Sequence, residues 1–159
     1  MPRQISLDTF EADLNRMIEQ WVNDSHLPLV VQLREPIARG FADIFNARVD
    51  SKGDAWPDHA ASTIAQYGPH PLLRLSDTMY RSLTTSSGDA HYELLSDTSI
   101  SWGTTVVYAS KQNFGEDKQN IPAREFCYWS DNMVNESMKV ISAYIDSRYL
   151  RVLTRGDNW

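Results

Sequence analysis

The chain has 159 residues, a formal net charge of −6 at pH 7 and a sequence pI near 5.1. This length suits one domain with a substantial core and is short for two, so we expect a single domain over residues 1–159. The composition, 42% hydrophobic and 23% charged, is that of an ordinary globular protein. The acidic balance argues against nucleic-acid binding through a global basic surface, and we expect no sequence-specific nucleic-acid partner.

The polar and apolar patterns also exclude several other classes of protein. The single cysteine, Cys127, cannot form an intramolecular disulfide, and no Cys/His pairs occur at zinc spacing. The first residues reach charges too soon for the apolar part of a signal peptide, and no run approaches the roughly 20 apolar residues of a membrane helix. We therefore expect a cytosolic protein with no metal, cofactor or membrane partner.

Two stretches in the first third of the chain carry apolar residues at three- and four-residue steps, which predicts helices. The first stripe comprises Leu7, Phe10, Leu14, Met17, Ile18, Trp21 and Val22, and the second comprises Val30, Leu33, Ile37, Phe41, Ile44 and Phe45. Pro36 lies inside the second stripe, so either the helix kinks there or a new helix begins with Pro36 in its first turn. We expect the kink. Residues 50–58 are rich in turn formers and predict a loop.

The remaining pattern mixes short helices, strands and one longer helix. Residues 59–67 and 73–84 indicate two short helices or turns. Residues 91–95 and 99–103 predict an antiparallel hairpin joined by 96–98, with a third strand near 124–129. From residue 131 an apolar stripe returns, and residues 147–159 are expected to form a mobile tail. The expected fold class is α+β: N-terminal helices, a small antiparallel β-sheet in the centre and a C-terminal helix.

Large side chains supply the candidates for an interaction surface. Trp102 and Trp129, in predicted strands, are expected to pack in the core. Trp56 lies in a loop, where it is either a core residue or an exposed anchor of the kind enriched at interface hot spots. Arg124 either forms a salt bridge on the sheet or makes a bidentate contact across a subunit interface, which the planar guanidinium favours.

Catalytic chemistry has a weaker basis in the sequence. His26, His59, His70 and His91 lie far apart in the chain, with no paired ligand spacing. Cys127 with a remote histidine such as His91 could form a nucleophile–base pair, but it lies between Phe126 and Tyr128 in a predicted strand, where a buried inert thiol is expected. We expect no enzyme, and we keep a small cytosolic hydrolase with a Cys/His site as the alternative.

Several short motifs follow one another along the chain: Gly53-Asp-Ala-Trp56, Thr63, Gly68, Pro71-Leu72-Leu73, Asp77-Thr78-Met79 with Ser82, Trp102-Gly103-Thr104, Tyr108-Ala109, Gln112-Asn-Phe-Gly115 and Ile121-Pro-Ala-Arg-Glu-Phe126. Their order resembles that of the virion morphogenesis family, the tail completion proteins of Mu-like and related long-tailed phages. The resemblance covers about residues 30–145. Met79 stands where that family has a glycine, so the turn there either avoids a positive φ or is built differently. The N-terminal helix and the tail 147–159 have no clear counterpart in that family.

The resemblance implies a structural protein that completes a phage tail or the head–tail junction by binding other virion proteins. It implies a homo-oligomeric ring, with the tail tube, tail terminator or neck proteins as further partners, and a location in the host cytoplasm during assembly and then in the virion of a phage or prophage. We expect the contacts to come from Trp56, Thr104, Tyr108, Gln112, Arg124 and Phe126. A monomeric protein-binding module is a further alternative.

Overall fold

The computed structural model describes residues 7–150 and confirms an α+β fold. The α-helices are α1 (Leu7–Asn23), α2 (Leu27–Gln32), α3 (Arg34–Ala47), α4 (Ala61–Tyr67), α5 (Thr78–Thr84), α6 (Ala109–Phe114) and α7 (Asp131–Ile145). Strands β1 (His91–Leu95) and β2 (Ile100–Thr104) form the hairpin. A 3₁₀ turn, η1 (Asp117–Gln119), and a π-helical turn, η2 (Asp146–Leu150), complete the elements. Residues 1–6 and 151–159 lie outside the described residues.

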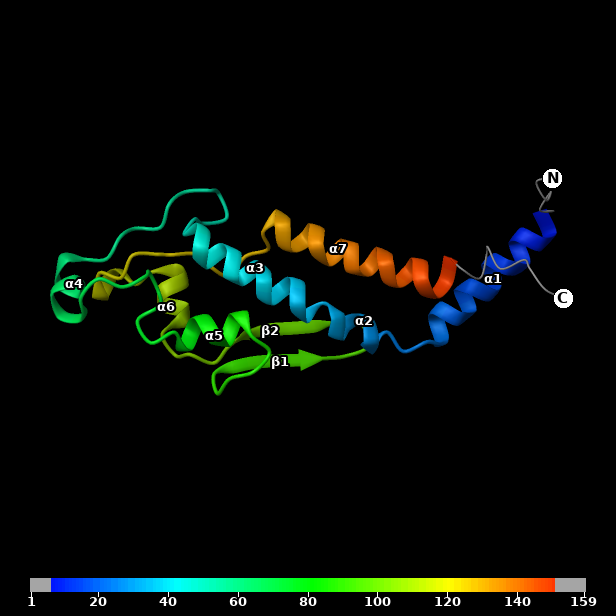
Figure 1. Ribbon diagram of the computed structural model, residues 1–159, viewed down its shortest axis with the longest axis horizontal. Coiled ribbons are helices and arrows are strands. Elements are labelled where there is room, and N and C mark those ends of the chain that lie inside the picture. Colours follow the sequence, from blue (N-terminus) through cyan, green and yellow to red (C-terminus); the bar gives the residue numbers. More distant parts are fainter. Residues whose placement is uncertain (1–6, 151–159) are drawn as a thin grey trace.

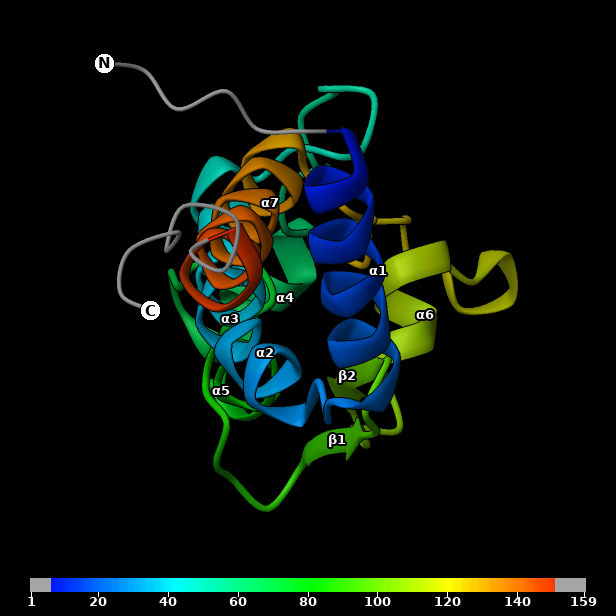
Figure 2. The ribbon, with the colours of Figure 1, turned by 90° about the vertical axis from the view of Figure 1, so that its right-hand side faces the viewer.

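The molecule is elongated, with α3 running along its middle (Figure 1). α7 packs on α3, while α5 and the hairpin lie on the other side of α3. α4, α6 and η1 form one end, and α1 projects from the opposite end (Figure 1). Viewed from that end, α1 is nearest to the viewer, and α2 and α7 are seen to one side of it (Figure 2). None of the helices described in residues 7–150 combines the length and the apolar character that crossing a bilayer requires.

The main core forms around the apolar face of α3, as its helical stripe predicts. Ile37, Phe41, Ile44 and Phe45 are buried there together with side chains from six other segments: Trp56, Leu72, Met79, Leu83, Ala109, Phe126 and Met133. A second, smaller cluster joins Leu29 to Tyr144 and Tyr149 near the base of α1. The core of the domain is therefore continuous from α3 to the α4 and α6 end, and α1 contributes little to it.

The prediction of a kink at Pro36 is wrong, because a new helix begins there. α2 ends at Gln32, and α3 begins at Arg34 with Pro36 in its first turn. Proline has no N–H to donate, so it is tolerated in a first turn, where those donors have no intrahelical partner. The N–H of Leu33 turns back to Val30 O at 3.2 Å instead of continuing an α-helical pattern.

The predicted hairpin and the C-terminal helix are confirmed, but residues 124–129 form no strand. In that segment the Arg124 N–H donates to Gln112 O, and the Phe126 and Cys127 N–H groups both donate to Asn113 Oδ1 at 2.9 Å. Because α6 takes these donors, they are not available for a ladder with β2. The sheet described in residues 7–150 therefore has two strands.

Two further expectations need correction near the C-terminal helix. The expected mobile tail begins too early, because 146–150 continue α7 as η2 and Tyr149 is 2% exposed. Its hydroxyl donates to Asp24 Oδ2 at 3.0 Å. The rest of the expected tail, 151–159, lies outside the described residues. Trp129 was expected in the core with Trp102, but it is 63% exposed. Trp102 does pack against the core, and its indole N–H donates to Leu83 O.

The turn before α5 does not require a glycine at position 79. The positive φ of this turn lies at Asp77, at 55°, and Asp77 is also held by an ion pair with Arg74 at 2.8 Å. Met79 is then already inside α5, where it is 1% exposed. The methionine thus fills the core in a helical conformation, and the turn is built differently from the Asp-Thr-Gly pattern.

Candidate functional site

Arg124 is a buried connector between two segments that lie far apart in the chain. It is 6% exposed, and its guanidinium donates to Pro57 O at 2.8 Å, to Asp58 O at 2.9 Å and to Gln112 Oε1 at 3.3 Å. These acceptors are neutral, and no carboxylate lies within ion-pair distance of Arg124 among the residues that the structure describes. Burial lowers its pKa below the ordinary value for arginine, and the nearby Asp58 opposes that change. Arg124 therefore fixes the 57–58 loop to α6.

α6 organises the backbone of the segment that follows it. Asn113 is buried, and its side-chain oxygen accepts the two N–H groups of Phe126 and Cys127. Gly115 has a φ of 75°, and a Cβ at this position would lie 2.9 Å from Ala123 N. A glycine is needed here for both reasons, because other residues rarely adopt this φ and the backbone of 121–123 passes too close.

Trp56 completes this network from the loop after α3. Its indole N–H donates to Glu125 O at 3.0 Å, and its ring meets Phe45 edge-on with centroids 5.8 Å apart. Ser51 in the same loop donates through its hydroxyl to the Glu125 carboxylate at 2.6 Å. The Gly53–Trp56 motif and the Ile121–Phe126 motif therefore hold each other in place across about 70 residues of sequence.

A cleft of about 630 Å³ opens beside this network, at the α4 and α6 end. We call it the Arg124 cleft. Its basic side chains are His59, His70, Arg74 and Arg124, and none of the residues that line it carries a carboxylate. Its remaining wall is mostly apolar or amide: Ala60, Ser62, Thr63, Tyr67, Leu73, Leu75, Ser76, Met79, Tyr108, Gln112, Gln119, Asn120, Ile121 and Pro122. Such a lining suits an apolar partner that also carries negative charge.

The two histidines of the cleft are in contact. Their rings lie with centroids 4.2 Å apart, and His59 Nε2 is 3.2 Å from His70 O. Burial lowers the pKa of His59 below its ordinary value, and the neighbouring His70 adds to this shift. This shift favours the neutral form of His59. Arg74 is paired with Asp77, whereas Arg124 has no carboxylate within ion-pair distance among the described residues.

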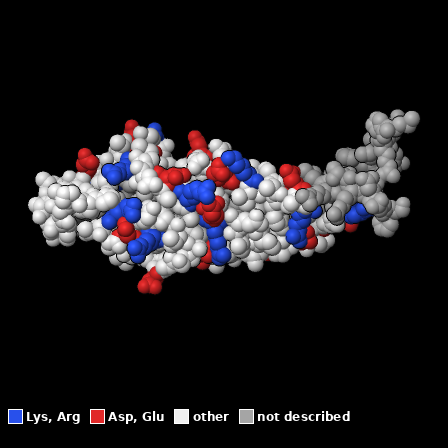
Figure 3. All heavy atoms as spheres, viewed as in Figure 1, with Lys and Arg blue, Asp and Glu red and all other residues white. Residues whose placement is uncertain are grey.

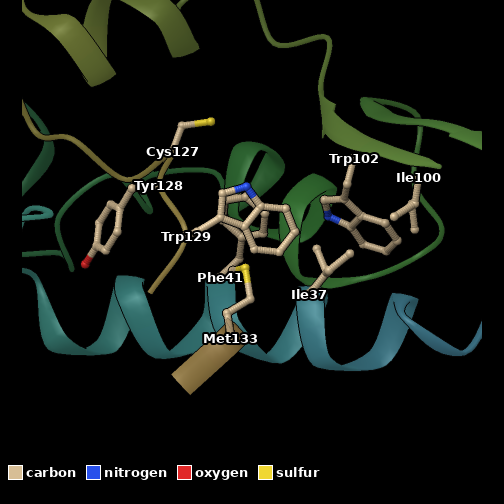
Figure 4. Close-up of a pocket in the computed structure, with 8 residues that line it drawn as sticks. All are labelled: Ile37, Phe41, Ile100, Trp102, Cys127, Tyr128, Trp129 and Met133. Carbon is tan, nitrogen blue, oxygen red and sulfur yellow. The ribbon is translucent and has the colours of Figure 1, made fainter. Parts of the chain in front are cut away.

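A smaller apolar pocket of about 120 Å³ lies on the other side of the core (Figure 4). Ile37 and Phe41 of α3, Ile100 and Trp102 of β2, the segment 127–129 and Met133 of α7 line it. It occupies the place where a third strand was expected. No charged side chain is among its lining residues.

Cys127, at the edge of this pocket, is exposed and not buried as expected, and it lacks the features of a nucleophile. The desolvating surroundings raise the pKa of its thiol above the ordinary value, and the Glu125 carboxylate acts in the same direction. A thiol with a raised pKa is protonated at pH 7 and reacts slowly. His91 makes its hydrogen bond elsewhere, with Nδ1 2.6 Å from Ser82 O, and its ring packs on Trp102. Within residues 7–150 no three His, Cys, Asp or Glu side chains gather as a metal ion would require.

The six expected interface residues differ in how far the structure buries them. Trp56, Arg124 and Phe126 are buried, so they cannot be exposed contacts in this conformation. Thr104 is half-buried and accepts a hydrogen bond from Ser82 at 2.7 Å, and Gln112 is half-buried against Arg124. Tyr108 is the exception, at 42% exposed, and it lines the Arg124 cleft. In this conformation Trp56 and Arg124 make their contacts within the chain, and a contact of either residue across a subunit interface stays a prediction.

Two more exposed apolar residues, which are not among the six expected interface residues, lie within the same 104–126 segment. Val107 is 90% exposed and Phe114 is 78% exposed, both at the ends of α6. A helical reading of 109–114 could have found Phe114, because the buried Ala109 and Asn113 lie four apart on one face and Phe114 lies off that face. On the face shown in Figure 3, charged residues of both signs are mixed over the middle, and the α4 end carries few of them.

Comparison with protein-family models, with curated proteins and with solved structures finds no match.

Proposed function

We propose that this chain is a structural assembly protein of a tailed phage or prophage, which completes the tail or the head–tail junction by binding other virion proteins. One observation carries the proposal. The motifs that resemble the tail completion family, at 53–56, 108–115 and 121–126, support one another through Trp56, Asn113 and Arg124. Motifs matched by chance along a chain would have no reason to meet in one network.

The role of these motif residues in the proposal is to shape a binding surface. The buried guanidinium and indole fix the loops, and the fixed loops present exposed apolar side chains at the α4 and α6 end. These are Val107, Tyr108 and Phe114, with Tyr67 and Leu75 beside the cleft. Single exposed apolar residues are common, but a gathering at one end of a molecule is typical of protein–protein contact. Further copies of this chain, tail tube, tail terminator and neck proteins are the proposed partners.

Deletion of the gene from the phage or prophage genome that encodes it tests this function. The expected result, by electron microscopy of lysates, is separate heads and incomplete tails, with infectivity restored by wild-type protein from a plasmid. A Phe114→Ser variant is expected to restore infectivity poorly, whereas Ser86→Glu, in an exposed loop away from this end, restores it fully. Normal particles and an unchanged titre after deletion would overturn the proposal.

A further inference from the structure

The first helix offers an apolar surface that no described residue of its own chain buries. Among the side chains from Glu11 to Asn23 none is buried, and Ile18 and Val22 are 49% and 72% exposed. α1 projects from the end of the molecule, and its C-terminal half approaches the body, where Met17 packs on the small cluster and Trp21 packs on Tyr149 with ring centroids 5.1 Å apart. An amphipathic helix with so little burial in its own domain gains most of its stability from a partner.

The charge of α1 narrows the choice of partner. Its sequence contains four acidic residues, Asp8, Glu11, Asp13 and Glu19, against the single basic Arg16, which leaves a net charge of −3. Pairing of α1 with α1 of another copy would bring two such surfaces together, and like charges oppose that contact. The apolar pocket between α3 and β2 is also a poor match, because it is small and its lining has no cationic group.

The Arg124 cleft matches α1 in both charge and polarity. It is lined by basic and apolar side chains without a carboxylate, and the buried Arg124, which bonds only neutral acceptors, adds positive charge beneath its wall without making a direct contact. Tyr67, Leu75 and Tyr108 at its wall are 52%, 56% and 42% exposed, so an apolar helix face can bury area there. A cleft of about 630 Å³ is large enough to accept side chains of one helical face.

We propose that α1 of one copy docks into the Arg124 cleft of the next copy. The helix and the cleft lie at opposite ends of the elongated molecule (Figure 1), so a chain cannot fill its own cleft with its own α1. The contact is therefore heterologous, joining one surface to a different surface, and repetition closes into a ring or continues as a filament. This inference rests on the proposed ring, for which it supplies the contact between neighbouring subunits.

Two variants that leave the core untouched break the contact from either side. Ile18→Ser with Val22→Ser removes apolar area from the exposed stripe of α1. Ser62→Glu adds a negative charge to the cleft at an exposed position in the first turn of α4, where an acidic residue is compatible with the helix. Ser86→Glu adds the same charge to an exposed loop outside the cleft and is the matched control. Circular dichroism and thermal melts establish that all three fold.

Light scattering over a concentration series is expected to show multimers for the wild type and for Ser86→Glu. Each of the other two variants raises the concentration needed for self-association by about tenfold or more. Raising NaCl from about 0.05 M to about 0.5 M is expected to weaken the wild-type multimer, because salt screens the charge complementarity. Retention of multimers by the α1 variant or by the cleft variant would overturn the docking but leave a ring built through other surfaces.

A mixing experiment separates this heterologous contact from a symmetric one. The α1 variant retains an intact cleft, and the cleft variant retains an intact α1, so an equimolar mixture is expected to form a 1:1 dimer and nothing larger. No association in the mixture, or association of each variant with itself, would contradict the docking. A wild type that is monomeric throughout also contradicts it, while the gene deletion described above decides the proposed function independently.

Discussion

At the residue scale, Trp56 is buried in the core although it lies in a loop, where the sequence alone left its burial open. Replacement by alanine is expected to destabilise the protein by about 3–5 kcal/mol, because a large buried side chain is lost and a cavity remains. Trp56→Phe keeps most of the buried area and loses the hydrogen bond to Glu125 O, so its cost is expected to be roughly 1–2 kcal/mol. Urea unfolding followed by circular dichroism measures both. Unchanged stability in Trp56→Ala would return Trp56 to the list of interface anchors.

Arg124 acts through its fork of donors as well as through its charge. In Arg124→Ala the Pro57 and Asp58 carbonyls lose their donor, and we expect a loss of about 1–3 kcal/mol of unfolding free energy. Arg124→Lys is expected to recover little of this, since an ammonium cannot reach several acceptors held in a plane. Thermal denaturation measures the series, with the exposed Arg81→Ala as control. Full recovery by lysine would show that charge alone is needed.

At the element scale, the close approach of α3 and α7 depends on Gly40. A Cβ at this position would lie 2.8 Å from Met133 Cβ, so Gly40→Ala is expected to cost about 1–3 kcal/mol. This clash outweighs the gain of up to about 1 kcal/mol that alanine brings to a helix. Met133→Ala removes Cε and Cγ, which would lie 2.5 Å and 2.8 Å from that Cβ, and leaves only the Cβ contact. The double variant should therefore lose less stability than the two single variants together. Strict additivity in urea unfolding would argue against this packing.

The junction between α1, α2 and η2 depends on the ionised form of Asp24. Hydrogen bonds from Arg148 and Tyr149, both at 3.0 Å, lower the pKa of Asp24 below its ordinary value. A group with a lowered folded-state pKa adds stability at pH values above its unfolded pKa of about 3.9, and this contribution is lost as the pH falls through the lowered value. Asp24→Asn should therefore be less stable than the wild type at pH 7, and the difference should shrink below about pH 4.

Thermal melts between pH 7 and pH 3 measure this difference. Asp89→Asn, in the exposed loop before β1, is the matched control for loss of a carboxylate. A difference between Asp24→Asn and the wild type that stays constant down to pH 3 would show that the ionised carboxylate does not hold the junction.

The elements that sequence reasoning predicted well are those with a periodic pattern of their own. The stripes of α1, α3 and α7 and the alternation of β1 and β2 are local signals, and the hairpin begins at His91 as expected. The prediction of a third strand was wrong because the N–H groups of Phe126 and Cys127 donate to the side chain of Asn113, which lies 13 and 14 positions away in the chain. A local pattern contains no information about such a competitor.

The candidate site was only partly predictable for the same reason. Trp56 and Arg124 have the residue types of interface hot spots, and those types are also suited to bridging loops inside a domain. The choice between the two roles depends on whether carbonyls such as Pro57 O and Glu125 O lie within reach, which only the folded chain determines. Tyr108 remained exposed because α6 buries its opposite face through Ala109 and Asn113.

At the scale of the whole molecule, the described residues place an exposed acidic helix at one end and a basic, apolar cleft at the other, an arrangement that suits the head-to-tail contact proposed above. Both surfaces stay incompletely buried in the single chain, and each complements the other in charge. We propose that these two surfaces bind each other in neighbouring copies, and this self-association is the central claim for a protein that resembles tail completion proteins. Binding to tail or neck proteins would then act on a ring and not on an isolated chain.

The molar mass of the purified wild-type protein in solution, measured by light scattering across a concentration series, tests the proposed self-association most directly. We predict a defined multimer of the 18.2 kDa chain that dissociates on dilution and at high salt. A mass of 18.2 kDa at every concentration, in low salt as in high salt, would contradict it.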